Sequence, residues 1–532
     1  METSTFSGPN YAFNYSAIQM VLPLDLTISI EESDPVVSFV EAVKEVNFNK
    51  YVKPITSNNT HSHNRAMLLR VLLFAFQENK RQLSEIAQLC KTDIRYMWLS
   101  NEERPSKMAF QRLTNELTAS IDDIFFDINQ SLIGTMSINT NIQFIDGTKF
   151  EANAHKNSFV YKKRILNART SLYEKISLCI KAINEEFGYS YETKDEYYSQ
   201  ELVYIAQYLM DVIAHLNIQI KYGKGQRKSI FQKYYDEILE YYIKLYEYEY
   251  WLDVMQNRNS CSKTDHDATF MATKWDYYNQ SGVTRPCYNA QIAVSDGLIV
   301  NGDIFQNPGD TLTYIPFMKR YYEYYGCYPK WPVADAGYGS YDNYIFNLRN
   351  AIELVQKYSM YNKENDPKFK KKTYHTFNWE VNEEGFKVCP QGRVFSEYLG
   401  DKYQRKGIEL QIKQVYCEPN KCLGCTHLGE CTKGKYKSLY IDVVQRELYQ
   451  KVNENLSTEF GKWLKRQRCA QVEGAFGSIK QNAKFTRFTR RGLKKVKMEF
   501  LLVCIGYNLR KYHQFRMDKY QRPSKKMGNE LN

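Results

Sequence analysis

Apolar residues in the first part of the chain recur at the spacing of helices. AMLLRVLLFAFQENK, residues 66–80, is apolar around most of its circumference, which is typical of a buried helix. A later helix is expected to begin at Pro105-Ser106, where a proline and a capping hydroxyl mark a helix start. Residues 1–140 are therefore predicted to form an N-terminal helical domain. Its short helices fit a helix-turn-helix DNA-binding module, and a plain helical bundle fits equally well.

The period of the apolar residues then changes twice. QFIDGTKFEANAHK, residues 143–156, begins with a short apolar run that ends in Asp146-Gly147. Residues 160–258 return to helical spacing and predict a long helical insertion. From Thr284 the period becomes two, and YNAQIAVSDGLIVNGDIF consists of two alternating runs around Asp296-Gly297. An Asp-Gly pair between matched alternating runs predicts a β-hairpin.

Further alternation of strands and helices follows the hairpin. A helix is expected after NPGD with Asp310 as its N-cap. YPKWPVADAGYGS gives a short apolar strand that runs into Asp335, and residues 341–358 add a helix and then a strand at IELVQKY. Strands that alternate with helices indicate an α/β fold with a mixed sheet.

The two Asp-Gly pairs are assigned different roles. Asp296-Gly297 lies between two good strands and is predicted to be a turn. After Asp146-Gly147 the return strand is poor, because Phe150 is the one large apolar residue between Thr148 and Ala154. Asp146 is therefore predicted to be a metal ligand on the first core strand, and Glu151 is the nearby acid that would be tested as an alternative.

Three carboxylates in this order suggest a divalent-cation site. Asp146 and Asp335 end strands, and Glu473 lies on a late helix, so the three can converge at one edge of a sheet. Hard oxygen ligands suit two divalent cations, which catalyse phosphoryl transfer when they lie about 4 Å apart. Each acid alone is weak evidence, since Asp335 could cap the following loop and Glu473 could be a surface residue.

Positive charge is concentrated near the C-terminus. The chain has a net charge of +12, and between Gly461 and Lys511 only Glu473 and Glu499 oppose the basic residues. Such a stretch is typical of a nucleic-acid surface, and a solvated surface helix is the alternative. At helical spacing Glu473 and Lys480 share a face, which suits a DNA strand lying across the helix. The candidate DNA-binding residues here are Lys480, Lys484, Arg487, Arg490 and Arg491.

Five of the 12 cysteines cluster between Cys389 and Cys431. Short spacings in a reducing compartment favour metal over disulfides, and four thiolates make a closed structural zinc site. The favoured ligands are Cys389, Cys422, Cys425 and Cys431. Cys417 is the first substitute and His427 a more distant one, and free thiols are the alternative. Zinc would stabilise residues 360–445, an insertion too polar to bury a core alone.

Nothing in the hydropathy pattern predicts a membrane protein. The sequence has no apolar run of the roughly 18–20 residues that a membrane span needs. The N-terminal METSTFSGPN lacks the charged-then-apolar layout of a signal peptide. We therefore expect a cytoplasmic protein, associated with the nucleoid if it binds DNA.

Four motifs together resemble bacterial insertion-sequence DDE transposases. They are QFIDGTKFEANAHKNSFVYKK, GVTRPCYNAQIAV, VADAGYGSYDNY and VEGAFGSIKQN followed by RFTRRG and YNLRK. The closest group carries an N-terminal helical domain and a cysteine-rich insertion. The resemblance implies an RNase H-like core, with Asp146, Asp335 and Glu473 as the acids that bind Mg²⁺ or Mn²⁺. A related branch has a lysine seven positions after the glutamate, matching Lys480.

The same branch carries a tyrosine and an arginine before the glutamate, and this chain departs from that pattern. Those two positions hold Arg466 and Cys469, and Arg468 lies one residue out of register with the family's arginine. As the arginine nearest to the family's position, Arg468 is the candidate DNA contact that the resemblance implies.

The sequence thus predicts a DNA transposase that cuts and joins the ends of an insertion sequence. Its partners would be double-stranded DNA, as terminal inverted repeats and target, and a second copy of the chain. An RNase H-like nuclease without strand transfer and a catalytically silent DNA-binding regulator are the alternatives. The expected parts are residues 1–140, helical and DNA-binding; 141–358 with 446–515, the catalytic core; 160–258, a helical insertion in that core; 360–445, the zinc-binding insertion; and 516–532, a disordered tail.

Overall fold

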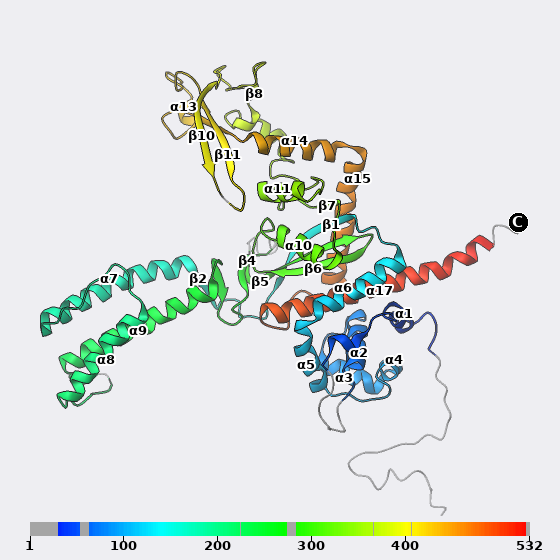
Figure 1. Cartoon of the computed structure of the whole chain (residues 1–532), viewed down its shortest axis with the longest axis horizontal. Coiled ribbons are helices and arrows are strands. Elements are labelled where there is room, and N and C mark those ends of the chain that lie inside the picture. Colours follow the sequence, from blue (N-terminus) through cyan, green and yellow to red (C-terminus); the bar gives the residue numbers. More distant parts are fainter. Residues whose placement is uncertain are drawn as a thin grey trace, which may run out of the picture.

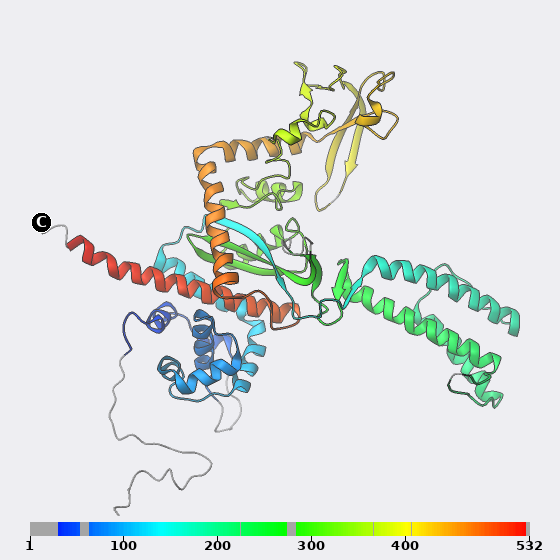
Figure 2. The same cartoon turned by 180° about the vertical axis from the view of Figure 1, so that it is seen from behind.

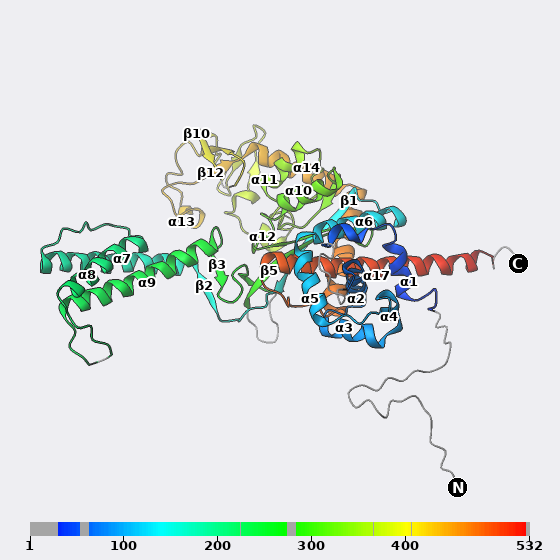
Figure 3. The ribbon, with the colours of Figure 1, turned by 60° about the horizontal axis from the view of Figure 1, so that its bottom comes forward.

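A computed structural model describes residues 30–53, 63–223, 225–273, 283–364, 366–405 and 407–527, without the side chains of residues 520–527. A central sheet lies between a body of N-terminal helices and a strand-rich subdomain, and a long helical arm projects to one side (Figures 1 and 2). The same arrangement is seen from below in Figure 3, where the last helix runs beneath the sheet.

The N-terminal helices pack against one another and against the last helix of the chain. They are α1 (Pro35–Ala42), η2 (Phe48–Tyr51), α2 (Arg65–Gln77), α3 (Leu83–Thr92), α4 (Ile94–Leu99), α5 (Lys107–Glu116), η3 (Leu117–Ala119) and α6 (Ile121–Met136). The expected start of α5 is confirmed, since the Ser106 side chain accepts a hydrogen bond from the Ala109 amide. One hydrophobic cluster continues from these helices into the sheet.

The central sheet is mixed, which confirms the predicted α/β class and fits an RNase H-like core. Its strands are β1 (Ile142–Glu151), β4 (Thr269–Ala272), β5 (Thr284–Ser295), β6 (Leu298–Phe305) and β7 (Trp331–Val333). The order is β4-β5-β1-β7, with β6 also paired to β5. β1 pairs antiparallel with β5 and parallel with β7.

The two Asp-Gly pairs differ as the sequence predicts. Ser295 pairs with Leu298, so Asp296 and Gly297 form a two-residue hairpin turn, and both have positive φ (46° and 83°). Positive φ at both central positions is the type I′ geometry that Asp-Gly favours. Asp146-Gly147 makes no turn, because β1 stays paired with β5 from Phe144 to Glu151.

Helices cover both faces of the sheet. Neighbouring residues on a strand point to opposite faces. Asn301 of β6 donates to the carbonyl of Phe317 in α10 (Tyr314–Tyr325), whereas a Cβ on Gly302 would contact Leu501 of α17 (Leu493–Met527). α10 and α17 therefore lie on different faces. Phe150 of β1 contacts Phe500, so its face is that of α17.

A continuous helix also crosses the α17 face and reaches β1. It comprises α15 (Glu459–Arg468), η5 (Cys469–Glu473), α16 (Gly474–Gly477) and η6 (Ser478–Asn482), and both η segments are π-helical. π-helical segments are rare and are frequently found at functional sites. α14 (Val443–Ser457) leads into this helix from the strand-rich subdomain (Figure 1).

The helical insertion between β1 and β5 forms the arm. Its elements are β2 (Phe159–Tyr161), α7 (Lys162–Phe187), α8 (Ser199–His215), α9 (Ile230–Met255) and β3 (Ser260–Ser262). The arm has a hydrophobic cluster of its own, which includes Ile176, Leu209 and Ile238. It leaves the core through the short β2–β3 pair and extends away from the sheet (Figure 2).

The cysteine-rich segment folds as a small subdomain on the side of the core away from the N-terminal helices (Figure 1). Between it and β7 lies α11 (Tyr341–Arg349). The subdomain contains α12 (Pro367–Lys370), η4 (Thr376–Asn378), β8 (Glu380–Val381), β9 (Lys387–Val388), β10 (Glu397–Gln404), β11 (Gln411–Cys417), α13 (Leu428–Cys431) and β12 (Ser438–Ile441). β10, β11 and β12 form an antiparallel sheet.

Two expectations about local structure are wrong. Residues 352–358 form no strand, although Leu354 and Val355 are buried. The Gln356 side chain donates to the carbonyl of Pro332, so a side chain joins this segment to β7 where strand pairing was expected. The tail expected to be disordered from residue 516 instead continues α17 as far as Met527, and residues 528–532 lie outside the described part. Within the described residues, no helix has the length and apolar character needed to cross a membrane.

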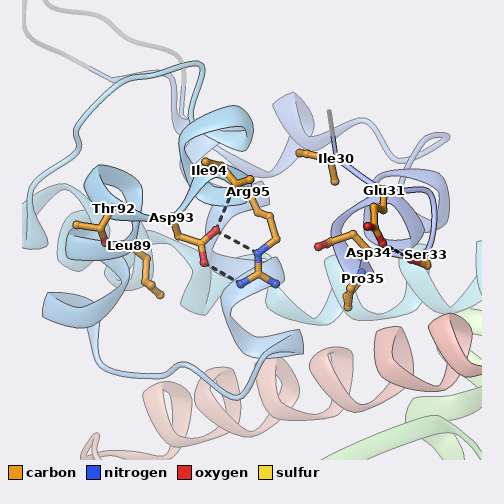
Figure 4. Close-up of a pocket in the computed structure, with 10 residues that line it drawn as sticks. All are labelled: Ile30, Glu31, Ser33, Asp34, Pro35, Leu89, Thr92, Asp93, Ile94 and Arg95. Carbon is orange, nitrogen blue, oxygen red and sulfur yellow. Dashed lines mark hydrogen bonds and ion pairs between the residues drawn. The ribbon is translucent and has the colours of Figure 1, made fainter. Parts of the chain in front are cut away.

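An open hollow of ≈ 780 Å³ lies among the N-terminal helices (Figure 4). It is bordered by residues 30–35 and 89–95. Arg95 points into it and donates to Asp93 at 2.7 Å and to Glu78, so its charge is already compensated within the protein.

The contact between α17 and α2 depends on a glycine. A Cβ on Gly506 would lie 2.3 Å from the carbonyl oxygen of Phe76. Arg510, one turn further along α17, donates to the carbonyl of Gln77 at 2.7 Å. The two helices therefore approach backbone to backbone, which holds the N-terminal helices on the core.

Gly506→Ala is expected to lower the free energy of unfolding by about 1–3 kcal/mol, because the added methyl forces the two backbones apart. Urea unfolding followed by circular dichroism measures the change. Gly134→Ala is the matched control, since a Cβ at Gly134 of α6 meets nothing within 4 Å. Alanine there should be neutral or stabilising by up to about 1 kcal/mol. Equal losses in both variants would contradict the close approach.

Candidate active site

Asp146 lies on the central strand of the sheet and is the most perturbed of the predicted acids. Its side chain is 24% exposed, and its Oδ2 is 3.6 Å from Nη1 of Arg468. The pKa of Asp146 is raised to about 6, chiefly by burial and to a smaller extent by the carboxylates of Asp335 and Asp310, against the opposing effect of Arg468. Perturbed acids of this kind are frequent at functional sites.

The pairing of β1 with β7 brings Asp335 to Asp146. The parallel ladder ends at Phe144 opposite Val333. Asp146 lies two residues further along β1, and Asp335 lies two residues beyond the end of β7, in the loop that follows it. Because parallel strands advance in the same direction, the two carboxylates come near each other, and the Asp335 charge contributes to the raised pKa of Asp146. Asp335 also accepts a hydrogen bond from the Gly337 amide at 2.8 Å, so it caps its loop as well.

Glu473 ends the first π-helical segment of the helix that crosses this face. That segment contacts β1 and β5, with Val472 buried beneath it and the Gln471 side chain accepting from the Gly297 amide at 2.7 Å. Glu473 itself is exposed. In the described part of the chain, no three His, Cys, Asp or Glu side chains are gathered closely enough to hold a metal ion.

Arg468 and Lys480, from the same helix, both face β1. Arg468 is next to Asp146, as described above. The Lys480 ammonium donates to the Thr148 hydroxyl at 2.5 Å and lies 4.7 Å from the centroid of the Phe150 ring. Asp146, Thr148 and Phe150 alternate along β1 and share one face. The two cations therefore lie along the same face of the strand as Asp146.

Glu151 does not join this group. It is an odd number of residues from Asp146 on an unbroken strand, so it projects from the opposite face. Its carboxylate lies 3.5 Å from Nε of Arg285. The pleat of β1 therefore separates the alternative acid from the site.

The other predicted DNA-binding residues form a basic loop beside the end of β1. Arg487 donates to the carbonyls of Ala152 and Ala154, at 3.1 and 3.0 Å, and Arg491 donates to the carbonyl of Asn153 at 2.8 Å. Arg490 is half-buried, and desolvation lowers its pKa. Lys484 is exposed. Arg487 and Arg491 thus stabilise the loop as well as charging it.

The prediction that Asp310 is the N-cap of the helix after NPGD is wrong. α10 begins at Tyr314 with Thr313 as its N-cap, so Asp310 does not cap it. Its Oδ1 instead accepts from the side-chain amides of Asn289 and Gln291, at 2.7 and 2.8 Å. Pro-Gly-Asp before a helix predicts a cap from local chemistry alone, whereas these partners lie on β5 and come close only in the folded sheet.

The four favoured cysteines meet in the small subdomain. Cys389, Cys422, Cys425 and Cys431 all line one cavity of ≈ 20 Å³. The nearby thiols of the other three contribute to raising the pKa of Cys431, after burial and against Lys437. Cys417 is directed elsewhere, and its thiol lies 3.4 Å from the carboxylate of Glu397. His427 also lines the cavity.

One part of the chain matches a known protein family. Residues 388–513 match a family described as the transposase DDE domain. The matched segment includes Glu473, Arg468 and Lys480 and the cysteine cluster, whereas Asp146 and Asp335 precede it. No curated protein and no solved structure matches the chain.

The raised pKa of Asp146 makes a prediction about stability without metal. A carboxyl whose pKa rises on folding binds its proton more tightly in the folded state, so folding loses stability as pH rises from about 4 through 6. Asp146→Asn removes this cost and should raise the free energy of unfolding at pH 7.5 in EDTA by about 1–2 kcal/mol.

The gain should shrink strongly by about pH 4 and vanish about one pH unit lower, where the carboxyl is protonated in both states. Thermal unfolding of parent and variant between about pH 3 and 8 measures it. A variant that is less stable than the parent by the same margin at every pH would show that Asp146 carries no such cost.

Proposed function

We propose that this chain, a DDE transposase by the family match over residues 388–513, cuts the ends of an insertion sequence and joins them to target DNA. The observation that supports the proposal most is the proximity of Asp146 and Asp335, which lie just beyond the last pair of the parallel β1–β7 ladder and interact electrostatically. A half-buried acid on the central strand, a second acid just after the neighbouring strand and a basic helix across the same face suit phosphoryl transfer.

Asp146 and Asp335, together with Glu473 on the crossing helix, would hold two Mg²⁺ or Mn²⁺ ions. Such ions activate a water or a 3′-hydroxyl and stabilise the leaving oxygen. The carboxylates supply the hard oxygen ligands that these cations need. Arg468 offsets part of this negative charge, because its guanidinium lies 3.6 Å from Asp146.

DNA would lie along the crossing helix and the basic loop that follows it. Lys480, Lys484 and Arg487 lie on this path, with Arg490 and Arg491 at its end. Contacts of this kind are to phosphates, so they fix the position of the duplex and make binding sensitive to salt. The terminal inverted repeats and the target would bind here in turn, and two copies of the chain would hold the two ends of the element.

The active-site assignment is tested by strand cleavage with Mg²⁺ on terminal-repeat DNA. Asp335→Asn and Glu473→Gln should each lower the cleavage rate by about 10²- to 10³-fold or more, because each removes a charge that holds the cations. Asp296→Asn is the matched control. It neutralises the aspartate of the other Asp-Gly pair, where asparagine is equally suited to the turn.

Undiminished cleavage by either active-site variant would contradict the assignment. Joining of the cut ends to a second DNA separates the proposed transposase from a nuclease on the same core. DNA binding without cleavage on any substrate would indicate a silent regulator.

The cysteine-rich subdomain is proposed to hold one structural zinc ion. Cys389, Cys422, Cys425 and Cys431 provide the four thiolates of a closed tetrahedral site, and the cavity they line has room for about one small occupant. Trp379 and Phe395 are the main buried apolar residues around it. A metal would therefore supply stability that so small a core lacks.

The purified protein should contain about one zinc per chain by elemental analysis. Cys425→Ser should lose this zinc and lower the melting temperature. Cys417→Ser, the matched control, should keep it, because Cys417 contacts Glu397 and does not line the cavity. Equal zinc loss from both variants, or a parent without zinc, would contradict the proposed ligand set.

A further inference from the structure

The crossing helix extends to both sides of Asp146 along β1. On one side, Lys480 and then the basic loop follow Asp146 toward the end of β1. On the other side, α15 lies beside β1 and β7 (Figure 1). The ring of Phe460, near the start of α15, has its centroid 5.1 Å from that of Trp331, which pairs with Ile142. α15 therefore covers the part of β1 that precedes Asp146.

Three cations gather on this second side. Lys465 and Arg468 are three residues apart on α15, so they share a face of the helix. The Lys465 ammonium donates to the Tyr361 hydroxyl at 3.1 Å and lies 5.5 Å from the centroid of the Tyr361 ring. The Lys357 ammonium lies 5.8 Å from the same centroid. Two segments that are distant in sequence thus bring their positive charges together next to Asp146, which Arg468 contacts.

The position of Lys357 is fixed by the backbone on which it lies. The side chain of its neighbour Gln356 is buried and donates to the carbonyl of Pro332 in β7 at 2.6 Å. A Cβ on Gly339 would collide with the carbonyl oxygen of Lys357, so the loop that follows Asp335 packs directly against this backbone. Lys357 is consequently half-buried beside the loop of the second acid, and little reorganisation is needed before it can bind a ligand.

The charges of this group suit an anion. Burial lowers the pKa of Lys357, and the charges of Arg468 and Lys465 lower it further against weaker opposing charges. The ring and hydroxyl of Tyr361 are neutral, so they orient both lysines without balancing their charge. An anion bound between the cations relieves their repulsion. A phosphate of DNA is the anion that the proposed reaction brings to this place.

The course of a DNA strand through the site requires such a surface. A strand that is cut beside Asp146 continues in both directions from the scissile phosphate. The basic loop lies in one direction along β1, and the group of Lys357, Lys465 and Arg468 lies in the other. Positive surface on both sides of the acids would hold the phosphates that precede and follow the cut.

We propose that Lys357, Lys465 and Arg468 form a second phosphate-binding surface, which holds the DNA strand on the side of the scissile phosphate away from the basic loop. During cleavage this part of the strand is the DNA that flanks the end of the element. The inference rests on the proposed function. It adds Lys357 and Lys465, which lie outside the four sequence motifs, as residues that position the substrate.

Two duplexes test the proposal by fluorescence anisotropy in EDTA, where no cleavage occurs. Both contain the terminal repeat, and one ends at the last base pair of the element. The other continues with about ten base pairs of flanking DNA, roughly one helical turn. Lys357→Gln and Lys465→Gln should each weaken binding of the flanked duplex by about 10-fold and affect the unflanked duplex little. The salt dependence of binding should fall by about one phosphate contact for the flanked duplex alone.

Matched variants separate charge from folding. Lys357→Arg and Lys465→Arg keep the positive charge and should bind the flanked duplex nearly as the parent does. Lys319→Gln, an exposed lysine of α10 on the other face of the sheet, should bind both duplexes as the parent does. Lys484→Gln, in the basic loop, should weaken binding of both duplexes. Melting temperatures in EDTA show whether each variant is folded.

Three results would overturn the inference. They are a parent that gains no affinity from the flank, glutamine variants that lose affinity equally for both duplexes, and glutamine variants that keep parental affinity for the flanked duplex. In the last case, a lowered melting temperature of Lys357→Gln would assign Lys357 a purely structural role.

The outcomes also distinguish this inference from the proposed function. If Asp335→Asn loses DNA cleavage while the lysine variants bind the flanked duplex as the parent does, the second surface is wrong and the transposase centre stands. If the lysine variants lose flank binding while Asp335→Asn cleaves as the parent does, the second surface stands and the active-site assignment is wrong. A parent that binds neither duplex would contradict both.

Discussion

The short parallel pairing of β1 with β7 is the constraint on which the rest of the site depends. Three residue pairs, from Ile142 with Trp331 to Phe144 with Val333, set the two strands in step. A parallel neighbour requires a crossover connection. Between β1 and β7 this connection comprises the arm, β4, the β5–β6 hairpin and α10. Because the ladder ends early, β1 continues with an open edge at Asp146 and Gly147, and Asp335 turns into that opening. A shift of one residue in this register would send one acid to the other face.

The same arrangement is costly without a ligand. Burial raises the pKa of Asp146 to about 6, with smaller contributions from the charges of Asp335 and Asp310, and Arg468 offsets only part of this rise. Stability given up in this way is expected where a protein must bind a cation. The glycines at 147 and 337 serve the same end, since a side chain at either would occupy the space into which Asp310 extends. Contacts elsewhere, including the α17–α2 contact, stabilise the fold and offset this cost in stability.

Much of the fold could be predicted from periodicity. The β5–β6 hairpin and the cap at Ser106 depend on neighbours in sequence, and both are confirmed. The absence of a turn at Asp146-Gly147 is also confirmed, but the sequence ended the strand at Asp146, whereas β1 continues to Glu151. The cap at Asp310 and the strand at 352–358 are wrong for one reason. The Asp310 side chain accepts a hydrogen bond from Gln291 of β5, and the Gln356 side chain donates one to the carbonyl of Pro332 in β7. The local sequence pattern does not indicate partners that are so distant along the chain. The α-helical spacing used for Glu473 and Lys480 likewise overlooks the π-helical segments, which alter the period.

Hydroxyl-radical mapping tests the central claim, that one cation centre lies where β1, β7 and the crossing helix meet. Fe²⁺ bound in place of Mg²⁺, with ascorbate and peroxide, cleaves the backbone close to the metal. The account predicts cuts near residues 146, 335 and 473, all suppressed by excess Mg²⁺. Mg²⁺-sensitive cuts confined to other parts of the chain would contradict it.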